Sequence, residues 1–211
     1  MYNDNMKKMV IKMDYDKIIK RKFKDIAIID YGIIKGNSVV VFIKVGQDGS
    51  IYGYDNKYLT IAKKLNEKYG YSVITASNPF DGNNPLDHDM NVVKNYCVKN
   101  KLKDYKVYYM GQSNGARIGI SWGYSHPEIK KMLLINAPLF INWHTLKNGI
   151  IQSVNQKMVL VYGDRDNSYR YVGLIEPLLN KNKKLIIIKG ADHNFINMLD
   201  SFIELPMNYF K

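Results

Sequence analysis

Apolar runs alternate with amphipathic segments along most of this chain. Short runs rich in β-branched and aromatic residues predict strands, and apolar positions three or four residues apart predict helices. The predicted strands are 24–31, 38–45, 72–76, 106–110, 132–135, 157–162 and 184–188, and the predicted helices are 58–69, 86–98, 114–124 and 169–179. Strands interleaved with helices indicate an α/β fold, in which a mostly parallel sheet carries helices on both faces.

Turn residues mark the boundaries of several of these elements. Gly36-Asn37 separates the first two strands and predicts that they pair as an antiparallel N-terminal hairpin. Gly70 follows the helix 58–69 and is a typical helix stop. The sheet is therefore expected to begin antiparallel and to continue parallel.

The chain length and the absence of linker-like stretches predict a single domain over residues 1–211. Residues 1–24 form a basic N-terminal extension or an edge strand, and residues 136–156 form a short insert that either makes a minimal cap or packs against the sheet. The first residues lack the apolar core of a signal peptide, and no run approaches the ~18 apolar residues of a membrane span. With Cys97 as the only cysteine, a soluble cytoplasmic protein is expected.

The formal net charge of +12 raises the question of a nucleic-acid partner. Nucleic-acid surfaces favour arginine interleaved with aromatic residues, whereas most basic residues here are lysine. The densest basic cluster, residues 17–24, is interpreted as a solvated edge. We therefore expect no nucleic-acid partner, although the charge would attract anionic molecules in a salt-dependent way. The sequence leaves the oligomeric state open.

Ser113 lies in the sequence Gly-Gln-Ser-Asn-Gly, between an apolar strand and a helical pattern. A serine on so tight a strand-to-helix turn has a strained backbone and requires small residues two positions away on each side. Gly111 and Gly115 meet this requirement. The pattern is typical of a nucleophile elbow, with a purely structural turn as the alternative.

Two later loops place an acid and a histidine after predicted parallel strands, where reactive groups gather in such sheets. The first loop reads Gly-Asp-Arg-Asp at 163–166, and the second contains His193. Serine, acid and histidine in this chain order are typical of α/β-hydrolases. On the elbow at 111–115, the acid turn at 163–166 and the histidine loop at 190–193, the chain resembles small α/β-hydrolases over about residues 38–195.

The resemblance implies roles for individual residues. In that family the acid commonly closes a Gly-x-x-Asp turn, which favours Asp166 over Asp164 and leaves Asp164 as a turn former. His193 would be the base and Ser113 the nucleophile. Partly exposed polar positions are expected for the other three histidines, which are His88, His126 and His144.

Backbone amides are expected to stabilise the oxyanion that forms during acyl transfer. The first is the amide of Asn114, which follows the nucleophile at a helix N-terminus. The second comes from the loop after the strand 38–45. The resemblance implies His-Gly there, but the chain reads Val-Gly-Gln, so the amide of Gln47 is preferred and those of Gly46 and Gly49 are alternatives.

The sequence thus predicts a serine hydrolase that cleaves small-molecule carboxylic esters through an acyl-enzyme. Gly46, Trp143, Phe80 and Tyr54 are the candidates for contacts with the substrate. No cofactor is expected, and no metal either, because the histidines and acids lack a ligand spacing such as His-x-x-x-His. A thioesterase or amidase would use the same triad, and a ligand-binding protein on a hydrolase fold is the alternative from another class.

Overall fold

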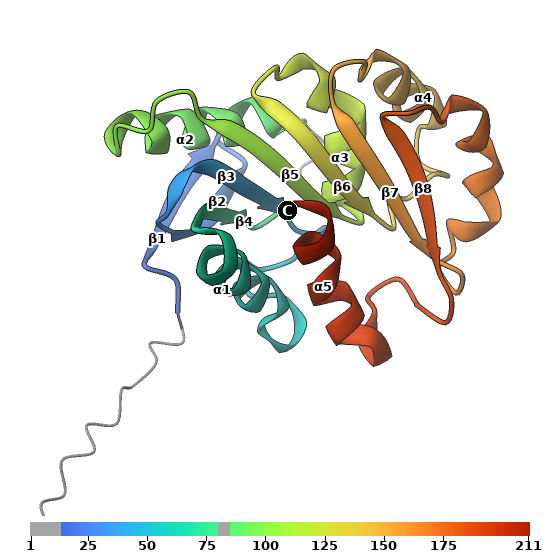
Figure 1. Cartoon of the computed structure of the whole chain (residues 1–211), viewed down its shortest axis with the longest axis horizontal. Coiled ribbons are helices and arrows are strands. Elements are labelled where there is room, and N and C mark those ends of the chain that lie inside the picture. The colour runs from blue at the N-terminus through green and yellow to red at the C-terminus, as the bar shows by residue number, and fades with distance from the viewer. Residues whose placement is uncertain (1–13, 80–84) are drawn as a thin grey trace, which may run out of the picture.

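The computed structural model describes residues 14–79 and 85–211, and these residues build one eight-stranded sheet (Figure 1). The strands are β1 (Lys17–Phe23), β2 (Ala27–Ile34), β3 (Asn37–Lys44), β4 (Tyr71–Ala76), β5 (Lys106–Gln112), β6 (Ile129–Ile135), β7 (Lys157–Gly163) and β8 (Lys183–Ile188). Their order in the sheet is β1-β2-β4-β3-β5-β6-β7-β8. β2 pairs antiparallel with both β1 and β4, and all other neighbours are parallel.

Two layers of helices cover the sheet, as the alternation of elements predicts. The helices are α1 (Lys57–Tyr69), α2 (Leu86–Lys99), α3 (Asn114–Trp122), α4 (Trp143–Gln152) and α5 (Leu199–Tyr209). α1 and α5 lie on one face, and α2, α3 and α4 lie on the other (Figure 1). Because strand side chains alternate between the faces, each layer buries its own apolar cluster. The predicted fold class, a mostly parallel sheet with an antiparallel start and helices on both faces, is confirmed.

The antiparallel hairpin is built from different strands than the sequence indicated. It joins β1 to β2, whereas β4 lies between β2 and β3, so the predicted pairing across Gly36-Asn37 was wrong. Gly36 is needed for close approach, since a Cβ on it would lie 2.4 Å from the carbonyl oxygen of Gly70. The amide of Asn37 also donates to that oxygen at 2.7 Å. Gly36-Asn37 has the sequence of a hairpin turn, but Gly36 is present because β3 begins in close contact with Gly70.

The helix predicted at 169–179 was also wrong. That segment forms two short 3₁₀ turns, η3 (Tyr169–Leu174) and η4 (Glu176–Leu178), because Gly173 and Pro177 interrupt regular helical bonding. Conversely, α5 was not predicted, since Pro206 lies inside it. The other predicted elements begin and end within three residues of the observed ones.

The insert 136–156 contains α4, which packs beside α3. A Cβ on Gly149 would lie 1.9 Å from the carbonyl oxygen of Ile120, so the two helices touch through their backbones. The side chains of Leu146 and Ile150 join the apolar cluster on that face of the sheet. α4 therefore packs against the body of the fold.

His126 connects the start of α2 to the start of β6 through two carboxylates. Its Nε2 lies 3.1 Å from Oδ1 of Asp87, and its Nδ1 lies 3.5 Å from Oε1 of Glu128. Burial lowers the pKa of His126, but the carboxylates of Glu128 and Asp87 outweigh burial and the pKa is raised. The hydrogen bond from His126 in turn lowers the pKa of Glu128.

Replacing His126 with Gln is expected to lower the free energy of unfolding by about 1 kcal/mol, in a pH-dependent way. The raised pKa of His126 contributes stability below its unfolded value and loses it as pH rises through the folded pKa. The lowered pKa of Glu128 contributes above its unfolded value and loses it as pH falls. The difference should therefore be largest between about pH 4.5 and 6.5. Urea titrations of the wild type and His126→Gln across this pH range measure the difference in free energy of unfolding. A difference that grows above neutral pH would contradict the prediction.

Candidate active site

Ser113 occupies the sharp turn between β5 and α3. Its φ of 54° and ψ of −121° are strained for a residue with a side chain. Its amide donates to the carbonyl oxygen of Ile135 at 2.8 Å, which ties the turn to the end of β6. Such strain persists only where the surroundings fix the backbone, and strained residues cluster at functional sites, so Ser113 is a candidate functional residue.

The two glycines of the motif let strand and helix pass at backbone contact. A Cβ on Gly111 would lie 2.6 Å from the amide nitrogen of Ala116, and one on Gly115 would lie 2.1 Å from the carbonyl oxygen of Lys44. Both of these atoms belong to the backbone, so neither could move aside as the end of a flexible side chain could. The requirement for small residues that the sequence indicated is therefore imposed by backbone atoms.

His193 reaches Ser113 from the loop that follows β8. Its Nε2 lies 2.9 Å from Oγ of Ser113, and a hydrogen bond joins its Nδ1 to Oδ2 of Asp166. Asp166 is buried, and its other oxygen accepts the amide of Ser168 at 2.7 Å. The side chain of His193 is 44% exposed, so the serine end of this chain is open to solvent. The structure thus brings together the three side chains singled out from the sequence.

The competing carboxylates hold turns in place. Oδ1 of Asp164 accepts the amide of Gly190 at 2.6 Å, which joins the acid turn to the start of the histidine loop. Oδ1 of Asp192 accepts the amides of Asn194 and Ile196 at 3.0 and 3.1 Å. Asp164 therefore acts as the turn former that its position in the sequence indicated.

The loop after β3 presents a backbone amide close to Ser113. In the turn 46–49, the amide of Asp48 donates to the carbonyl oxygen of Asn78 at 2.8 Å, and that of Gly49 to Gly46 at 3.0 Å. The amide of Gln47 has no acceptor among the described residues. A Cβ on Gly46 would lie 3.4 Å from Cβ of Ser113, so the turn sits directly beside the serine.

Asn114 supplies a second amide on the other side of the serine. It is the first residue of α3, and the amide at that position has no partner within the helix. The helix dipole adds a partial positive charge at the same place. The two amides expected to face an oxyanion are therefore both close to Ser113. That of Asn114 is next to it in the chain, and that of Gln47 belongs to the turn beside it.

A buried hydrogen-bond chain that sequence reasoning missed supports the histidine loop. The hydroxyl of Tyr58 donates to Oε1 of Gln112, and Nε2 of Gln112 donates to the carbonyl oxygen of His193 at 3.1 Å. Burial raises the pKa of the Tyr58 hydroxyl, against an opposing hydrogen bond from the amide of Gly46. The chain thus links α1, through the end of β5, to the backbone of the histidine.

Asn136 ties the same loop to the acid turn. It follows β6 directly, is fully buried and has a φ of 49°. Its Nδ2 donates to the carbonyl oxygens of Asp192 and His193 at 3.1 and 3.0 Å, and its Oδ1 accepts the amide of Gly163 at 2.9 Å. The sequence signal for this residue is an amide side chain immediately after a buried apolar strand.

A pocket of about 370 Å³ opens at Ser113. Its walls come from the segment 46–54, the start of α1 and the loop 193–196. Lys57 is buried in this wall, with its Nζ 4.4 Å from the centroid of the Phe202 ring. Burial lowers the pKa of Lys57 to about 8, against an opposing effect of Asp192. A lysine with a lowered pKa therefore lines the same pocket as Ser113.

Only some of the residues predicted to contact the substrate line the pocket at Ser113. Gly46, Gln47 and Tyr54 line the pocket. Trp143 begins α4, packs against the apolar cluster on the other face of the sheet, and does not line this pocket. Trp143 thus contributes to packing of the fold, and the pocket at Ser113 is lined by other residues. Phe80 lies outside the described residues.

Within residues 14–79 and 85–211, no group of three or more histidine, cysteine or acidic side chains is placed to hold a metal ion. No helix of these same residues combines the length and the apolar character needed to cross a membrane.

Solved structures share this architecture over nearly the whole chain. Est1E from Butyrivibrio proteoclasticus has a TM-score of 0.71 and 14% identity, with 92% of this chain and 97% of that chain covered. An α/β serine hydrolase homologue from Coxiella burnetii has a TM-score of 0.72 and 16% identity over 93% and 98% of the two chains. An α/β serine hydrolase without a lid from Xanthomonas campestris has a TM-score of 0.66 and 15% identity over 90% and 92%. The chain has the α/β-hydrolase fold. No protein-family model and no curated protein matches its sequence.

Within the α/β-hydrolase fold, the three side chains occupy the carboxyl ends of separate parallel strands. Ser113 follows β5, Asp166 follows β7 by three residues, and His193 follows β8 by five. In open α/β sheets, ligands bind at this edge, because the loops after the strands converge there. The fold therefore explains how residues far apart in the chain meet at one pocket.

Proposed function

We propose that this protein is a serine hydrolase that cleaves carboxylic esters of small molecules through an acyl-enzyme. The observation that carries the proposal is the hydrogen-bonded chain from Ser113 through His193 to the buried Asp166, at the wall of an open pocket. A strained serine, an imidazole aimed at its hydroxyl and a buried carboxylate behind the imidazole are the parts that acyl transfer requires.

In the acylation step, Oγ of Ser113 attacks the ester carbonyl while Nε2 of His193 takes the hydroxyl proton. Asp166 keeps the imidazole in the tautomer that leaves Nε2 free, and it stabilises the imidazolium. The amides of Asn114 and Gln47 donate to the oxyanion of the tetrahedral intermediate. His193 then gives its proton to the leaving alkoxide, and the acyl group stays on the serine.

Deacylation repeats the same steps with water as the nucleophile. His193 takes a proton from the water as it attacks the acyl carbonyl, and the amides again hold the oxyanion. The intermediate collapses to release the carboxylic acid, and the proton returns from His193 to Oγ of Ser113. Every proton is exchanged between the substrate, water and these two side chains, so the cycle needs no cofactor.

The openness of the site favours short acyl groups or an ester on a larger molecule. His193 is almost half exposed, and α4 of the insert packs beside α3 instead of lining the pocket. Thioesters and amides react through the same triad, so a panel of oxygen esters, thioesters and anilides that share one acyl group ranks the three leaving groups directly.

Covalent labelling with a fluorophosphonate tests the proposal first. The probe is expected to modify Ser113, since only an activated serine attacks it readily, and peptide mass spectrometry locates the adduct. Labelling should disappear in Ser113→Ala and persist in Ser125→Ala, which removes an exposed hydroxyl twelve residues further along the chain. A folded wild-type protein that takes no label would overturn the proposal in favour of a ligand-binding protein on a hydrolase fold.

A further inference from the structure

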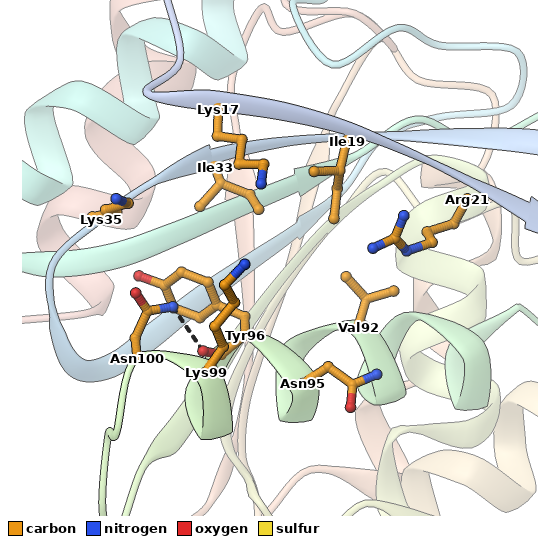
Figure 2. A pocket seen from close by; sticks show the side chains of 10 residues that line it. All are labelled: Lys17, Ile19, Arg21, Ile33, Lys35, Val92, Asn95, Tyr96, Lys99 and Asn100. Carbon is orange, nitrogen blue, oxygen red and sulfur yellow. Dashed lines mark hydrogen bonds between the residues drawn. The ribbon is translucent and has the colours of Figure 1, made fainter.

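A second cavity of about 220 Å³ lies between the β1–β2 hairpin and α2 (Figure 2). It shares no lining residue with the pocket at Ser113. Four apolar or aromatic side chains, Ile19, Ile33, Val92 and Tyr96, form its floor, and four basic residues, Lys17, Arg21, Lys35 and Lys99, stand around them. Such a combination of an apolar floor with a cationic rim calls for an explanation.

The alternation of side chains along β1 creates one wall of this cavity. Lys17, Ile19 and Arg21 are two residues apart, so they project from the same face of the edge strand. Lys17 lies opposite Ile33 of β2 in the register, which brings that apolar side chain into the same wall. On the other side, Tyr96 and Lys99 lie on one face of α2.

The basic residues on the two faces of β1 differ in their partners. Lys20 and Lys22, on the face turned away from the cavity, lie 3.7 Å from Asp30 and 2.7 Å from Asp25. In contrast, none of the four basic side chains at the cavity forms an ion pair with a described residue, and no acidic residue lines it.

One carboxylate near this wall is already engaged by the backbone. Oδ2 of Asp16 accepts the backbone amide of Lys35 at 2.8 Å. All the charged side chains that line the cavity itself are basic. The basic cluster at 17–24, interpreted from the sequence as a solvated edge, is divided by the strand into a paired face and an unpaired one.

We propose that this cavity binds a small amphipathic anion, namely a medium-chain carboxylate. Its apolar tail would lie on Ile19, Ile33 and Val92, where burial removes the tail from water. Its head group would lie among the basic side chains, for which Arg21 provides the planar fork that matches a carboxylate.

The size and the floor of the cavity narrow the class of ligand. The volume lies below the ~300–1,000 Å³ of typical drug-sized pockets, which indicates a small molecule. An inorganic anion would leave the apolar floor uncovered, and so would a nucleic-acid backbone. The inference uses no residue of the proposed active site and does not depend on the proposed function.

Titration calorimetry of the full chain with decanoate at low ionic strength tests the proposal. We expect saturable binding of one decanoate per chain. The double variant Arg21→Glu/Lys99→Glu should weaken it at least about tenfold, since hydrogen bonds to charged groups are among the stronger ones. The matched control Lys147→Glu/Lys181→Glu changes the net charge equally at exposed positions that do not line the cavity and should leave affinity within about twofold, because it removes no hydrogen bond to the carboxylate. Equal losses in both would show attraction to net charge alone and overturn the proposal.

A cavity-filling variant and two further ligands test whether decanoate binds in this cavity and whether the basic side chains recognise its head group. Asn95 is an exposed residue of α2 that lines the cavity, so Asn95→Trp should fill it and abolish binding without a change of charge. Decyltrimethylammonium should not bind, and decanol should bind at least about tenfold more weakly than decanoate. Unaltered decanoate binding by the folded Asn95→Trp variant would place the ligand elsewhere, the pocket at Ser113 included, and would overturn the proposal. Equal affinity for decanol would overturn the role of the basic rim.

Discussion

Asp166→Asn is expected to lower kcat/KM for an activated ester by about 10,000-fold, with little change in stability. The carboxylate of Asp166 is hydrogen-bonded to Nδ1 of His193, so it selects the tautomer whose Nε2 accepts the proton of Ser113. An asparagine amide at this place donates to Nδ1 and holds the imidazole in the wrong tautomer. It also leaves the imidazolium of the transition state without a counter-charge. Initial rates over a range of substrate concentrations measure the loss.

Asp164→Asn is the matched control, because it makes the same chemical change two residues earlier in the same turn. Oδ1 of Asp164 accepts the amide of Gly190, and the oxygen of an asparagine can accept the same bond. Activity is therefore expected to stay within about threefold of wild type, since no interaction made only in the transition state is removed. Similar losses in the two variants would show that the acid was assigned to the wrong carboxylate.

Residues whose requirements are local could be recognised from the sequence. Ser113 needs small neighbours two positions away and a strand-to-helix change, and all of this lies within about ten residues of chain. Asp166 and His193 lie in short loops after apolar strands, and the family resemblance favoured Asp166 over Asp164 and His193 over the other histidines. Each member of the predicted triad can therefore be recognised from the few residues around it, without knowledge of the rest of the fold.

The order of the strands and the supports of the site depend on distant contacts, which the sequence does not display. Gly36 contacts Gly70, so its role in letting β3 begin beside β4 has no local signature. Tyr58 and Gln112 meet across 54 positions, and Asn136 reaches His193 across 57. Tyr58, Gln112 and Asn136 lie in or next to helices and strands, and the residues around them in the sequence give no sign of these distant contacts. Pattern reasoning thus located the three side chains that the structure brings together and missed the residues that hold them in place.

Loss of one partner from the buried ion pair between Lys44 and Asp89 is expected to have the largest effect on stability. Lys44, the last residue of β3, and Asp89 of α2 both have fully buried side chains, with Nζ 3.0 Å from Oδ2. Nζ of Lys44 also donates to the carbonyl oxygen of Ser77 at 3.0 Å, and the hydroxyl of Tyr31 donates to Oδ1 of Asp89 at 2.7 Å. The four groups join β2, β3 and α2 across the middle of one face of the sheet.

Asp89→Ala is expected to lower the free energy of unfolding by about 3–5 kcal/mol, because it leaves the ammonium group of Lys44 buried without a counter-charge. Urea denaturation followed by circular dichroism measures the loss. Lys64→Ala is the comparison at the surface, since Lys64 and Glu204 are 3.0 Å apart but 47% and 49% exposed. It should cost less than about 1 kcal/mol.

The double variant Lys44→Met/Asp89→Leu separates the cost of an unpaired charge from the worth of the pair. Replacement of both partners by apolar side chains removes the buried charges together, so most of the stability lost in Asp89→Ala should return. Lys44 also precedes the turn 46–49 that carries the amide of Gln47, and its carbonyl oxygen contacts the elbow at Gly115. Fluorophosphonate labelling of Ser113 in a stable double variant therefore shows whether the pair also positions the site. A double variant as unstable as Asp89→Ala would instead mean that the loss comes from packing around Asp89 and not from the uncompensated charge.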